Sequence, residues 1–239
     1  MAKKLPELSI FFPFWDEEAN IEAVVESAIP IAKNISEKWE IIMVDDGSSD
    51  NTLKIATKLA QKNDRLRVVS LGQNRGYGAA LRAGFEHARY NTVVFTDGDR
   101  QFDFSEIGKF VEEINTTDIV IGFRKKRNDK NLFKRLLLMN LLKVCDFLVF
   151  RFYFKDIDCG FKMFKKEALE KISPLRSDGA MITTEILAKA KRKKLKIKEV
   201  GVTHFPRISG HQSGANFPVI VRAILESFIL WYDLHYGRA

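Results

Sequence analysis

The chain has 239 residues, 46% of them hydrophobic, which is enough to bury the core of one globular domain and excludes a disordered chain. Lysine and arginine number 39 against 31 aspartates and glutamates, so the net charge is +8, and the excess gathers in residues 124–143 and 189–198. Such basic runs suit nucleic acid, anionic lipid headgroups or substrate phosphates, although a solvated helix face would explain 189–198 equally well. The only two cysteines, Cys145 and Cys159, argue against a disulfide framework and fit a reducing compartment.

The first half of the chain alternates expected strands with expected helices, and no apolar signal region precedes the first strand. Alternation of this kind predicts an α/β fold with a mostly parallel, doubly wound sheet. We expect strands near 8–14, 39–45, 66–71, 92–96 and 118–122, and helices near 17–33, 51–63, 75–89 and 103–115.

Acidic residues follow three of these strands, in the segments 16–18, 45–50 and 97–99. The carboxyl ends of parallel strands form the ligand crevice of an open α/β sheet, so these side chains should meet at one edge. Asp97 and Asp99, separated by one residue, suit a hard divalent cation that substrate phosphates and water help to hold. Alone, either segment would be more typical of a polar turn or a helix cap. Three strands that end in acid favour a ligand site.

The second half contains two long apolar segments. Residues 132–154 predict a helix that is apolar round most of its circumference, with one polar seam formed by Asn140, Lys143, Asp146 and Arg151. These interior charges disfavour a transmembrane span, which leaves a core helix or an interfacial helix. The segment from Phe217 to Tyr236 leaves a similar choice, because it could pack against the domain or lie at a bilayer surface.

Eight ordered segments carry a resemblance to a known family: FPFWDEEAN, VDDGSSDNT, NRGYGAALRAGF, TDGDRQFD, GFRKKR, DIDCGFKMF, a helical Thr-Thr-Glu, and HFPRISGHQSG. Together they resemble the inverting family 2 glycosyltransferases of GT-A fold, and most closely the branch that contains dolichol-phosphate mannose synthase and other polyprenyl-phosphate glycosyltransferases. The resemblance implies a GT-A catalytic domain over residues 1–216, with a Rossmann-like nucleotide-binding half. Residues 217–239 would then form a C-terminal amphipathic helix that could lie at a membrane interface, as could the helix expected over 132–154.

The resemblance also assigns the donor side of the site. It implies that a nucleotide-diphosphate sugar binds with Mg²⁺ or Mn²⁺, which would stabilise the charge that develops on the leaving diphosphate. Arginine suits a diphosphate because its guanidinium binds two oxygens at once. The family pattern places the nucleoside against Pro13, Trp15, Glu17, Asp46 and Gly98, the ribose and metal against Asp97 and Asp99, a further metal bond at Gln101, and the diphosphate at Arg207.

On the acceptor side, the resemblance assigns the polyprenyl phosphate to Arg124 and Arg135, whose alternative is a generic basic surface. A phosphate monoester is mostly dianionic at neutral pH, so it needs no strong general base. We therefore expect Asp156, which stands at the family's base position, to orient acceptor groups. Asp158 is a weaker candidate, and Glu185 matches the family on a helix whose acids are ordinarily solvated.

The chain departs from the family pattern at two positions. Asp16 stands where relatives usually have Asn, and Phe102 follows Gln101 where relatives often have His. The first change adds negative charge close to the expected diphosphate. Neither change removes an expected metal ligand.

The functional expectation is an inverting hexosyltransferase that uses a UDP-glucose or GDP-mannose class donor and a dolichyl or undecaprenyl phosphate. If the chain is complete, it should be peripheral on the cytoplasmic face of a membrane, with an anionic membrane surface and no nucleic acid as partner. The alternatives are a family 2 transferase with a saccharide acceptor and a non-catalytic nucleotide-sugar or nucleic-acid binder. Two others are a phosphatase with Asp97 as nucleophile and a dinucleotide-binding protein, suggested by Gly76 and Gly78 although Gly84 falls off the spacing.

Overall fold

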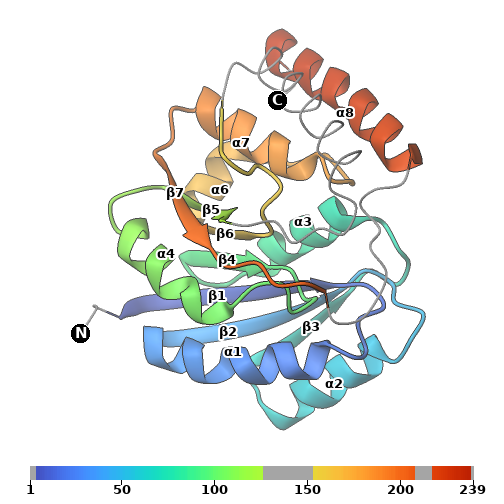
Figure 1. Cartoon of the computed structure of the whole chain (residues 1–239), viewed down its shortest axis with the longest axis vertical. Helices are drawn as coiled ribbons and strands as arrows, with labels where there is room; N and C mark the ends of the chain where they lie inside the picture. Colours follow the sequence, from blue (N-terminus) through green and yellow to red (C-terminus); the bar gives the residue numbers. More distant parts are fainter. Residues whose placement is uncertain (1–3, 126–152, 208–216, 238–239) are drawn as a thin grey trace.

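A computed structural model describes residues 4–125, 153–207 and 217–237 of the chain. Its centre is a seven-stranded sheet in the order β3-β2-β1-β4-β6-β5-β7 (Figure 1). β6 runs antiparallel to both of its neighbours, and the remaining pairs are parallel. The strands are β1 (Leu5–Phe14), β2 (Ser36–Asp45), β3 (Leu66–Ser70), β4 (Thr92–Thr96), β5 (Ile119–Arg124), β6 (Phe161–Lys165) and β7 (Ile197–Val202).

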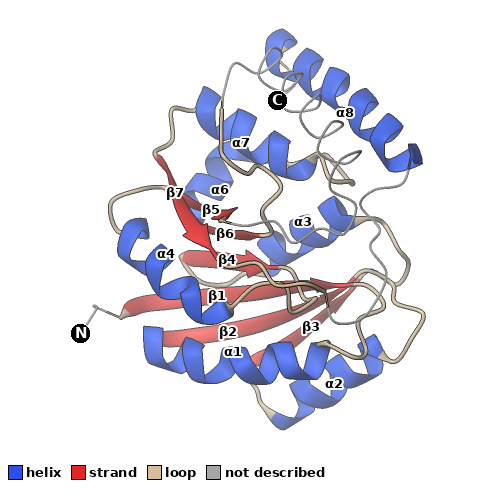
Figure 2. Ribbon diagram, in the orientation of Figure 1, coloured by secondary structure: helices blue, strands red, loops and turns tan. Residues whose placement is uncertain are grey.

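Helices cover both faces of the sheet (Figure 2). One layer consists of α1 (Ile21–Ile35), α2 (Thr52–Lys62), the short 3₁₀ helix η1 (Phe104–Glu106) and α4 (Ile107–Ile114). The opposite layer consists of α3 (Tyr77–His87), α6 (Lys166–Ile172), α7 (Ile182–Arg192) and α8 (Phe217–Tyr236). In the described part of the chain, no helix combines the length and the apolar composition needed to cross a bilayer.

Each face of the sheet has its own hydrophobic core, because successive strand side chains point to opposite faces. In β1, Ile10 and Phe12 join the core beneath α1 and α4, whereas Phe11 joins the core beneath α3 and α7. All three side chains are almost fully buried. The alternating side chains of this one strand therefore contribute to both cores, as a doubly wound sheet requires.

The element order expected from the sequence is confirmed, but several boundaries differ. The helix expected from residue 17 begins at Ile21, because the loop before it is held elsewhere: the Glu17 N–H donates to Thr52 Oγ1 at 2.8 Å. The helix expected over 103–115 is divided into η1 and α4, and the Asp103 side chain caps η1 by accepting from the Ser105 N–H at 2.9 Å. The apolar segment 132–154 lies almost wholly outside the described residues.

α3 lies close against the sheet at a glycine. A Cβ atom at Gly84 would lie 2.3 Å from Cδ2 of Phe11, closer than any packed pair tolerates. Gly108 in α4 differs, since a Cβ atom there would meet nothing within 4 Å. The two helical glycines thus separate a packing requirement from helix propensity.

We predict that Gly84→Ala lowers the free energy of unfolding by about 1–3 kcal/mol, the usual cost of overpacking a filled core. Gly108→Ala should instead raise it by about 0.5–1 kcal/mol, because alanine loses less backbone entropy in a helix. Urea unfolding of both variants measures the difference. Equal effects of the two substitutions would contradict the close packing of α3 on Phe11.

Candidate functional site

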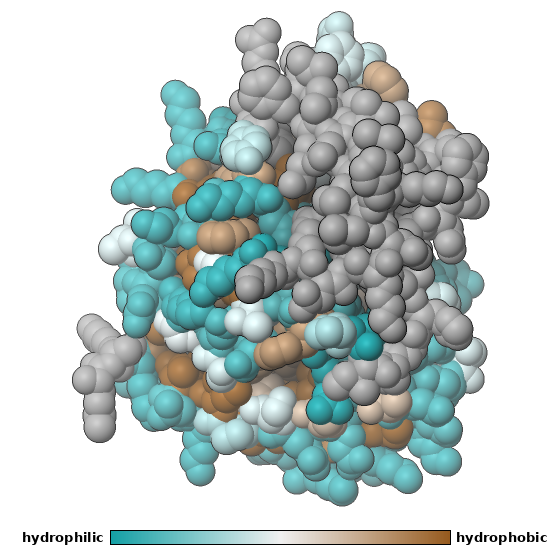
Figure 3. All heavy atoms as spheres, in the orientation of Figure 1, coloured by the Kyte–Doolittle hydropathy of each residue, from teal (hydrophilic) through white to brown (hydrophobic). Residues whose placement is uncertain are grey.

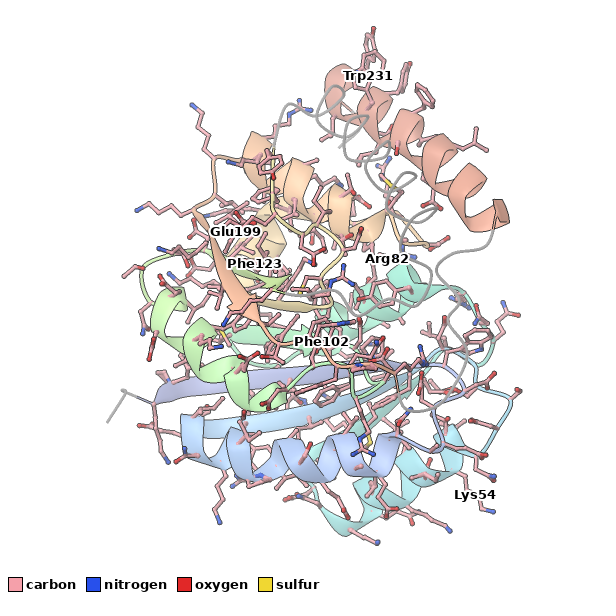
Figure 4. The ribbon with its side chains drawn as sticks, in the orientation of Figure 1. Lys54, Arg82, Phe102, Phe123, Glu199 and Trp231 are labelled. Atoms are coloured by element: carbon pink, nitrogen blue, oxygen red, sulfur yellow. The ribbon has the colours of Figure 1, made fainter. Side chains whose placement is uncertain are left out.

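The acidic segments expected at one edge of the sheet do meet there. β1 pairs with both β2 and β4 in parallel, so the loops that follow these strands emerge side by side. Gly98 secures the contact between two of the loops, since a Cβ atom there would lie 2.3 Å from Cε1 of Phe14 and 2.9 Å from the Pro13 carbonyl. Phe102, labelled in Figure 4, lies at this edge and forms an isolated β-bridge with His204 from the segment after β7.

Asp97 is the first carboxylate after β4, and its neighbours fix its orientation. The Tyr77 hydroxyl donates to Asp97 Oδ1 at 2.8 Å, and the Asp97 N–H donates to the Gly160 carbonyl at 3.1 Å. A Cβ atom at position 160 would lie 2.0 Å from Asp97 Oδ2, so only glycine fits beside the carboxylate. Burial, followed by the charge of Asp99, raises the pKa of Asp97 to about 7.

Asp99 faces the segment that follows β7. Its Oδ1 accepts from the Gln101 N–H at 3.1 Å, and its Oδ2 lies 3.5 Å from Arg207 Nη1. The Gln101 side chain donates to the Phe205 carbonyl at 3.1 Å, while the Phe205 N–H donates to the Gln101 carbonyl at 2.8 Å. Burial raises the pKa of Asp99. Residues 204–207 are therefore joined to the Asp-x-Asp loop by backbone and side-chain bonds.

Arg207 also donates to Glu17, so its guanidinium connects the loop after β1 with the loop after β4. Glu17 is buried and accepts from Asn20 Nδ2 at 2.6 Å. Burial raises the pKa of Glu17, against the opposing influence of Asn20 and Arg207. In this arrangement Arg207 offsets part of the negative charge that the strand ends bring together.

These residues fit a divalent cation. Burial raises the pKa of both Asp97 and Asp99, and the charge of Asp99 raises that of Asp97 further, so a bound cation would relieve an electrostatic cost already present. The described residues contain no preformed cluster of three or more His, Cys, Asp or Glu side chains able to hold a metal. Two carboxylates and the Gln101 amide match a hard cation whose remaining ligands are water and substrate phosphate.

A cavity of about 630 Å³ opens beside this group, within the range of small-molecule sites. α1 forms one wall, and the Asp-x-Asp loop and the segment 205–207 form the others. Its lining includes Val24, Ser27, Asp97, Phe102, Pro206 and Arg207.

The loop after β2 forms hydrogen bonds with neighbouring loops that the sequence alone did not reveal. Both oxygens of Asp46 accept backbone N–H groups, from Arg75 at 2.8 Å and Gly76 at 2.9 Å. Asp16 accepts from the Ser49 N–H at 2.6 Å, so the extra charge at this position is bonded to the neighbouring loop. Trp15 stays exposed. Contact of Trp15 or Asp46 with a nucleoside remains a prediction.

Arg124, the last residue of β5, forms a bidentate ion pair with Asp156. Nε lies 2.6 Å from Oδ2 and Nη2 lies 2.8 Å from Oδ1, with the side chains 10% and 3% exposed. Burial alone would lower the pKa of Arg124, but the bonds to Asp156 raise it above its ordinary value. Both oxygens of Asp156 are thus occupied, whereas Asp158 is exposed. Arg135, the second arginine expected to face the acceptor, lies outside the described residues.

Two buried charges were misjudged or missed in the sequence. The expectation that Glu185 is solvated is wrong, because it is 1% exposed, accepts from the Arg176 and Ser177 N–H groups, and pairs with Lys189 at 2.9 Å. Lys162 is fully buried and donates to the carbonyls of Ile157 and Cys159, and no sequence pattern indicated it.

The sequence model described as glycosyl transferase family 2 matches residues 9–173, more than half of the chain. The chain belongs to this family. It is 34% identical over 220 residues to dolichyl-phosphate beta-glucosyltransferase of Saccharomyces cerevisiae, covering 82% of this chain and 66% of the relative. It is also 29% identical over 242 residues to dodecaprenyl-phosphate galacturonate synthase of Rhizobium johnstonii, covering 97% and 70%. The family 2 chain thus spans about two thirds of the length of these curated relatives.

Solved structures show the same fold. Glucosyl-3-phosphoglycerate synthase of Mycobacterium tuberculosis, in complex with Mn²⁺, uridine diphosphate and glucosyl-3-phosphoglycerate, superposes with a TM-score of 0.70 at 21% identity. The match covers 95% of this chain and 80% of that one. The expected GT-A fold is therefore confirmed for this family 2 chain.

The dinucleotide-binding alternative gains no support from the glycines before and within α3. The Gly78 and Ala79 N–H groups donate to the Asp178 carbonyl at 2.8 and 3.4 Å, so a protein atom occupies the helix N-terminus where a pyrophosphate would bind. A Cβ atom at Gly76 would lie 2.6 Å from that same carbonyl. Close approach of two backbones, rather than a phosphate, explains these glycines in this family 2 chain.

We predict that Asp156→Asn lowers the free energy of unfolding by about 3–5 kcal/mol, since it leaves the buried Arg124 charge without its partner. Asp158→Asn, a change of the same kind at an exposed neighbour, should leave stability nearly unchanged. Chemical denaturation of both variants measures the effect. A stable Asp156→Asn protein without activity would favour a general base at this position instead.

Proposed function

We propose that the chain transfers a hexose from a nucleotide-diphosphate sugar to a polyprenyl phosphate, with inversion at the anomeric carbon. The observation that carries this proposal is the pair of partly buried carboxylates, Asp97 and Asp99, with Arg207 beside Asp99, at the carboxyl edge of the GT-A sheet. The relatives from Saccharomyces cerevisiae and Rhizobium johnstonii are named as polyprenyl-phosphate sugar transferases, which supports the acceptor class. UDP-glucose is the first donor to test and GDP-mannose the second, because the first relative is named a glucosyltransferase.

In the proposed reaction, an acceptor phosphate oxygen forms a bond to the anomeric carbon while the bond from that carbon to the donor diphosphate breaks. The electron pair of the broken bond leaves on the diphosphate, and attack from the opposite face inverts the carbon. Arg207 lines the cavity and can bind the departing diphosphate with two of its guanidinium nitrogens once these exchange Asp99 and Glu17 for phosphate oxygens. The dianionic acceptor supplies its own nucleophile, so no side chain has to remove a proton.

Asp97, Asp99 and Gln101 are the residues that would hold Mg²⁺ or Mn²⁺, and the ion would contribute Lewis-acid stabilisation of the diphosphate charge. The role of the protein residues is to bring their oxygens to one edge and keep bulk water away. Asp156 holds Arg124 rather than serving as a base, because both carboxylate oxygens already accept hydrogen bonds from that guanidinium. Arg124 then acts as a fixed positive charge on the acceptor side.

We further propose that α8 lies at a lipid surface, because the side of this helix that faces away from the domain is apolar. Its inner side carries Asp233, paired with Arg176 at 3.3 Å, and the buried Leu230 and Leu234. Its outer side carries large apolar residues between 46% and 66% exposed, part of which is visible at the top of Figure 3. They are Leu225, Phe228, Ile229, Tyr232 and Tyr236. This spacing places them on one helix face, and tyrosine suits the boundary between lipid and water.

The reaction predicts a product that partitions into organic solvent. Incubation of the chain with Mg²⁺ or Mn²⁺, labelled UDP-glucose or GDP-mannose, and dolichyl or undecaprenyl phosphate should transfer label to the extracted lipid. Asp99→Asn should lower the rate at least about 100-fold, as loss of a charge-stabilising group does, with an unchanged melting temperature. Asp64→Asn, at an exposed turn, is the matched control. Label found only on saccharide acceptors would refute the polyprenyl-phosphate assignment.

Membrane contact through α8 predicts flotation with anionic liposomes. The paired change of Phe228 and Ile229 to Ser should reduce the floated fraction several-fold, since each substitution removes exposed apolar area that lipid would cover. The paired change of both residues to Leu keeps an apolar face and should float like the wild type. Equal flotation of the serine and leucine proteins would show that α8 does not contact the lipid.

A further inference from the structure

The loop between α6 and α7, residues 173–181, is docked on the beginning of α3. The Gly78 N–H donates to the Asp178 carbonyl at 2.8 Å, and Arg82 reaches from α3 to the Ser177 carbonyl and the Asp178 carboxylate. Figure 4 labels Arg82 at this junction of α3 with the loop. A Cβ atom at Gly78 would lie 2.3 Å from the Ser177 carbonyl, so the contact exists only because this position has no side chain.

The same loop is anchored from the other side by α7. Glu185 accepts from the Arg176 N–H at 3.0 Å and from the Ser177 N–H at 2.8 Å. Lys189 pairs with Glu185 at 2.9 Å and donates to the Pro174 carbonyl. Both side chains of this pair are 5% exposed or less. A buried, fully bonded pair holds its partners in one geometry, so the loop is a rigid support rather than a surface turn.

Tyr77, the first residue of α3, lies between this support and the Asp-x-Asp loop. Its ring packs against the core beneath α3 and α7, and its hydroxyl donates to Asp97 Oδ1 at 2.8 Å. Oδ2, the other oxygen of Asp97, faces Gly160. The carboxylate is thus confined on both sides.

We propose that Tyr77 is a positioning residue that fixes the Asp97 carboxylate for cation binding, and that the loop 173–181 holds Tyr77 in that position. This inference rests on the proposed function, because it requires Asp97 to be a ligand. Side chains that orient a metal ligand by a hydrogen bond commonly contribute 10–100-fold to metal affinity, which sets the expected effect at about that size. Tyr77 itself need not touch the cation or the donor.

The test is Mn²⁺ binding to the full chain, followed by the electron paramagnetic resonance signal of free Mn²⁺. Tyr77→Phe should bind Mn²⁺ about 10–100-fold more weakly, because only the hydroxyl is lost. Arg82→Met keeps Tyr77 but loosens the loop, and should weaken binding by a smaller factor. Tyr90→Phe, in the turn before β4, also removes one tyrosine hydroxyl and should match the wild type. Melting temperatures in EDTA confirm that each variant is folded.

Turnover supplies the second measurement. Tyr77→Phe should raise the Mn²⁺ concentration needed for half-maximal turnover about 10–100-fold while the KM for polyprenyl phosphate stays unchanged, a shift that a smaller fraction of folded protein would not produce. Asp97→Asn distinguishes a failure of the proposed cation site from a failure of the proposed role of Tyr77. If Asp97→Asn binds Mn²⁺ like the wild type, the cation site of the proposed function is wrong. If Asp97→Asn loses binding but Tyr77→Phe retains it, the site stands and the positioning role of Tyr77 is overturned. If Arg82→Met binds Mn²⁺ with wild-type affinity, the proposed role of the loop 173–181 is overturned.

Discussion

The repulsion between poorly solvated carboxylates at the ends of neighbouring strands is the constraint on which the rest of this structure depends. Glu17, Asp97 and Asp99 are all desolvated, and the pKa of each is raised in consequence. Left alone, such a cluster would protonate or open to solvent. The Tyr77 hydroxyl, the Asn20 amide and the Arg207 guanidinium hold the cluster together, and each comes from a different part of the chain. This electrostatic cost is confined to a single edge of the sheet, where a bound cation would offset it.

The surrounding strands and loops position the charged residues of this edge. Parallel pairing of β1 with β2 and β4 brings the acid-bearing loops together, and residues 204–207 close over them through bonds with Gln101. Arg124, held by its ion pair with Asp156, lies at the end of β5 in register with Val202 of β7. This edge of the sheet therefore combines the carboxylates of the Asp-x-Asp loop with two arginines, Arg124 and Arg207, that acidic partners already hold.

Local patterns predicted the elements and the acid-ended strands, because strand and helix periods and terminal residues are properties of short segments. The family resemblance placed Arg207 near the acids. What remained hidden depends on tertiary packing: Glu17 meets Arg207 from opposite ends of the chain, and no local pattern shows that the Arg124 guanidinium is already bonded to Asp156. Burial of Glu185 was missed for a related reason, since a Glu-to-Lys pair on a helix reads the same on a solvated face and in a core.

The central claim is that the carboxylates after β4 bind the cation that accompanies a nucleotide diphosphate. Anomalous scattering from crystals grown with Mn²⁺ and UDP tests this most directly, because the Mn²⁺ peak reports position without reference to activity. The account predicts one peak bonded to Asp99 and Asp97, within about 2.0–2.4 Å of carboxylate oxygen, with diphosphate oxygens on its open side. A Mn²⁺ peak elsewhere, with Arg207 still bonded to Asp99 and Glu17, would contradict it.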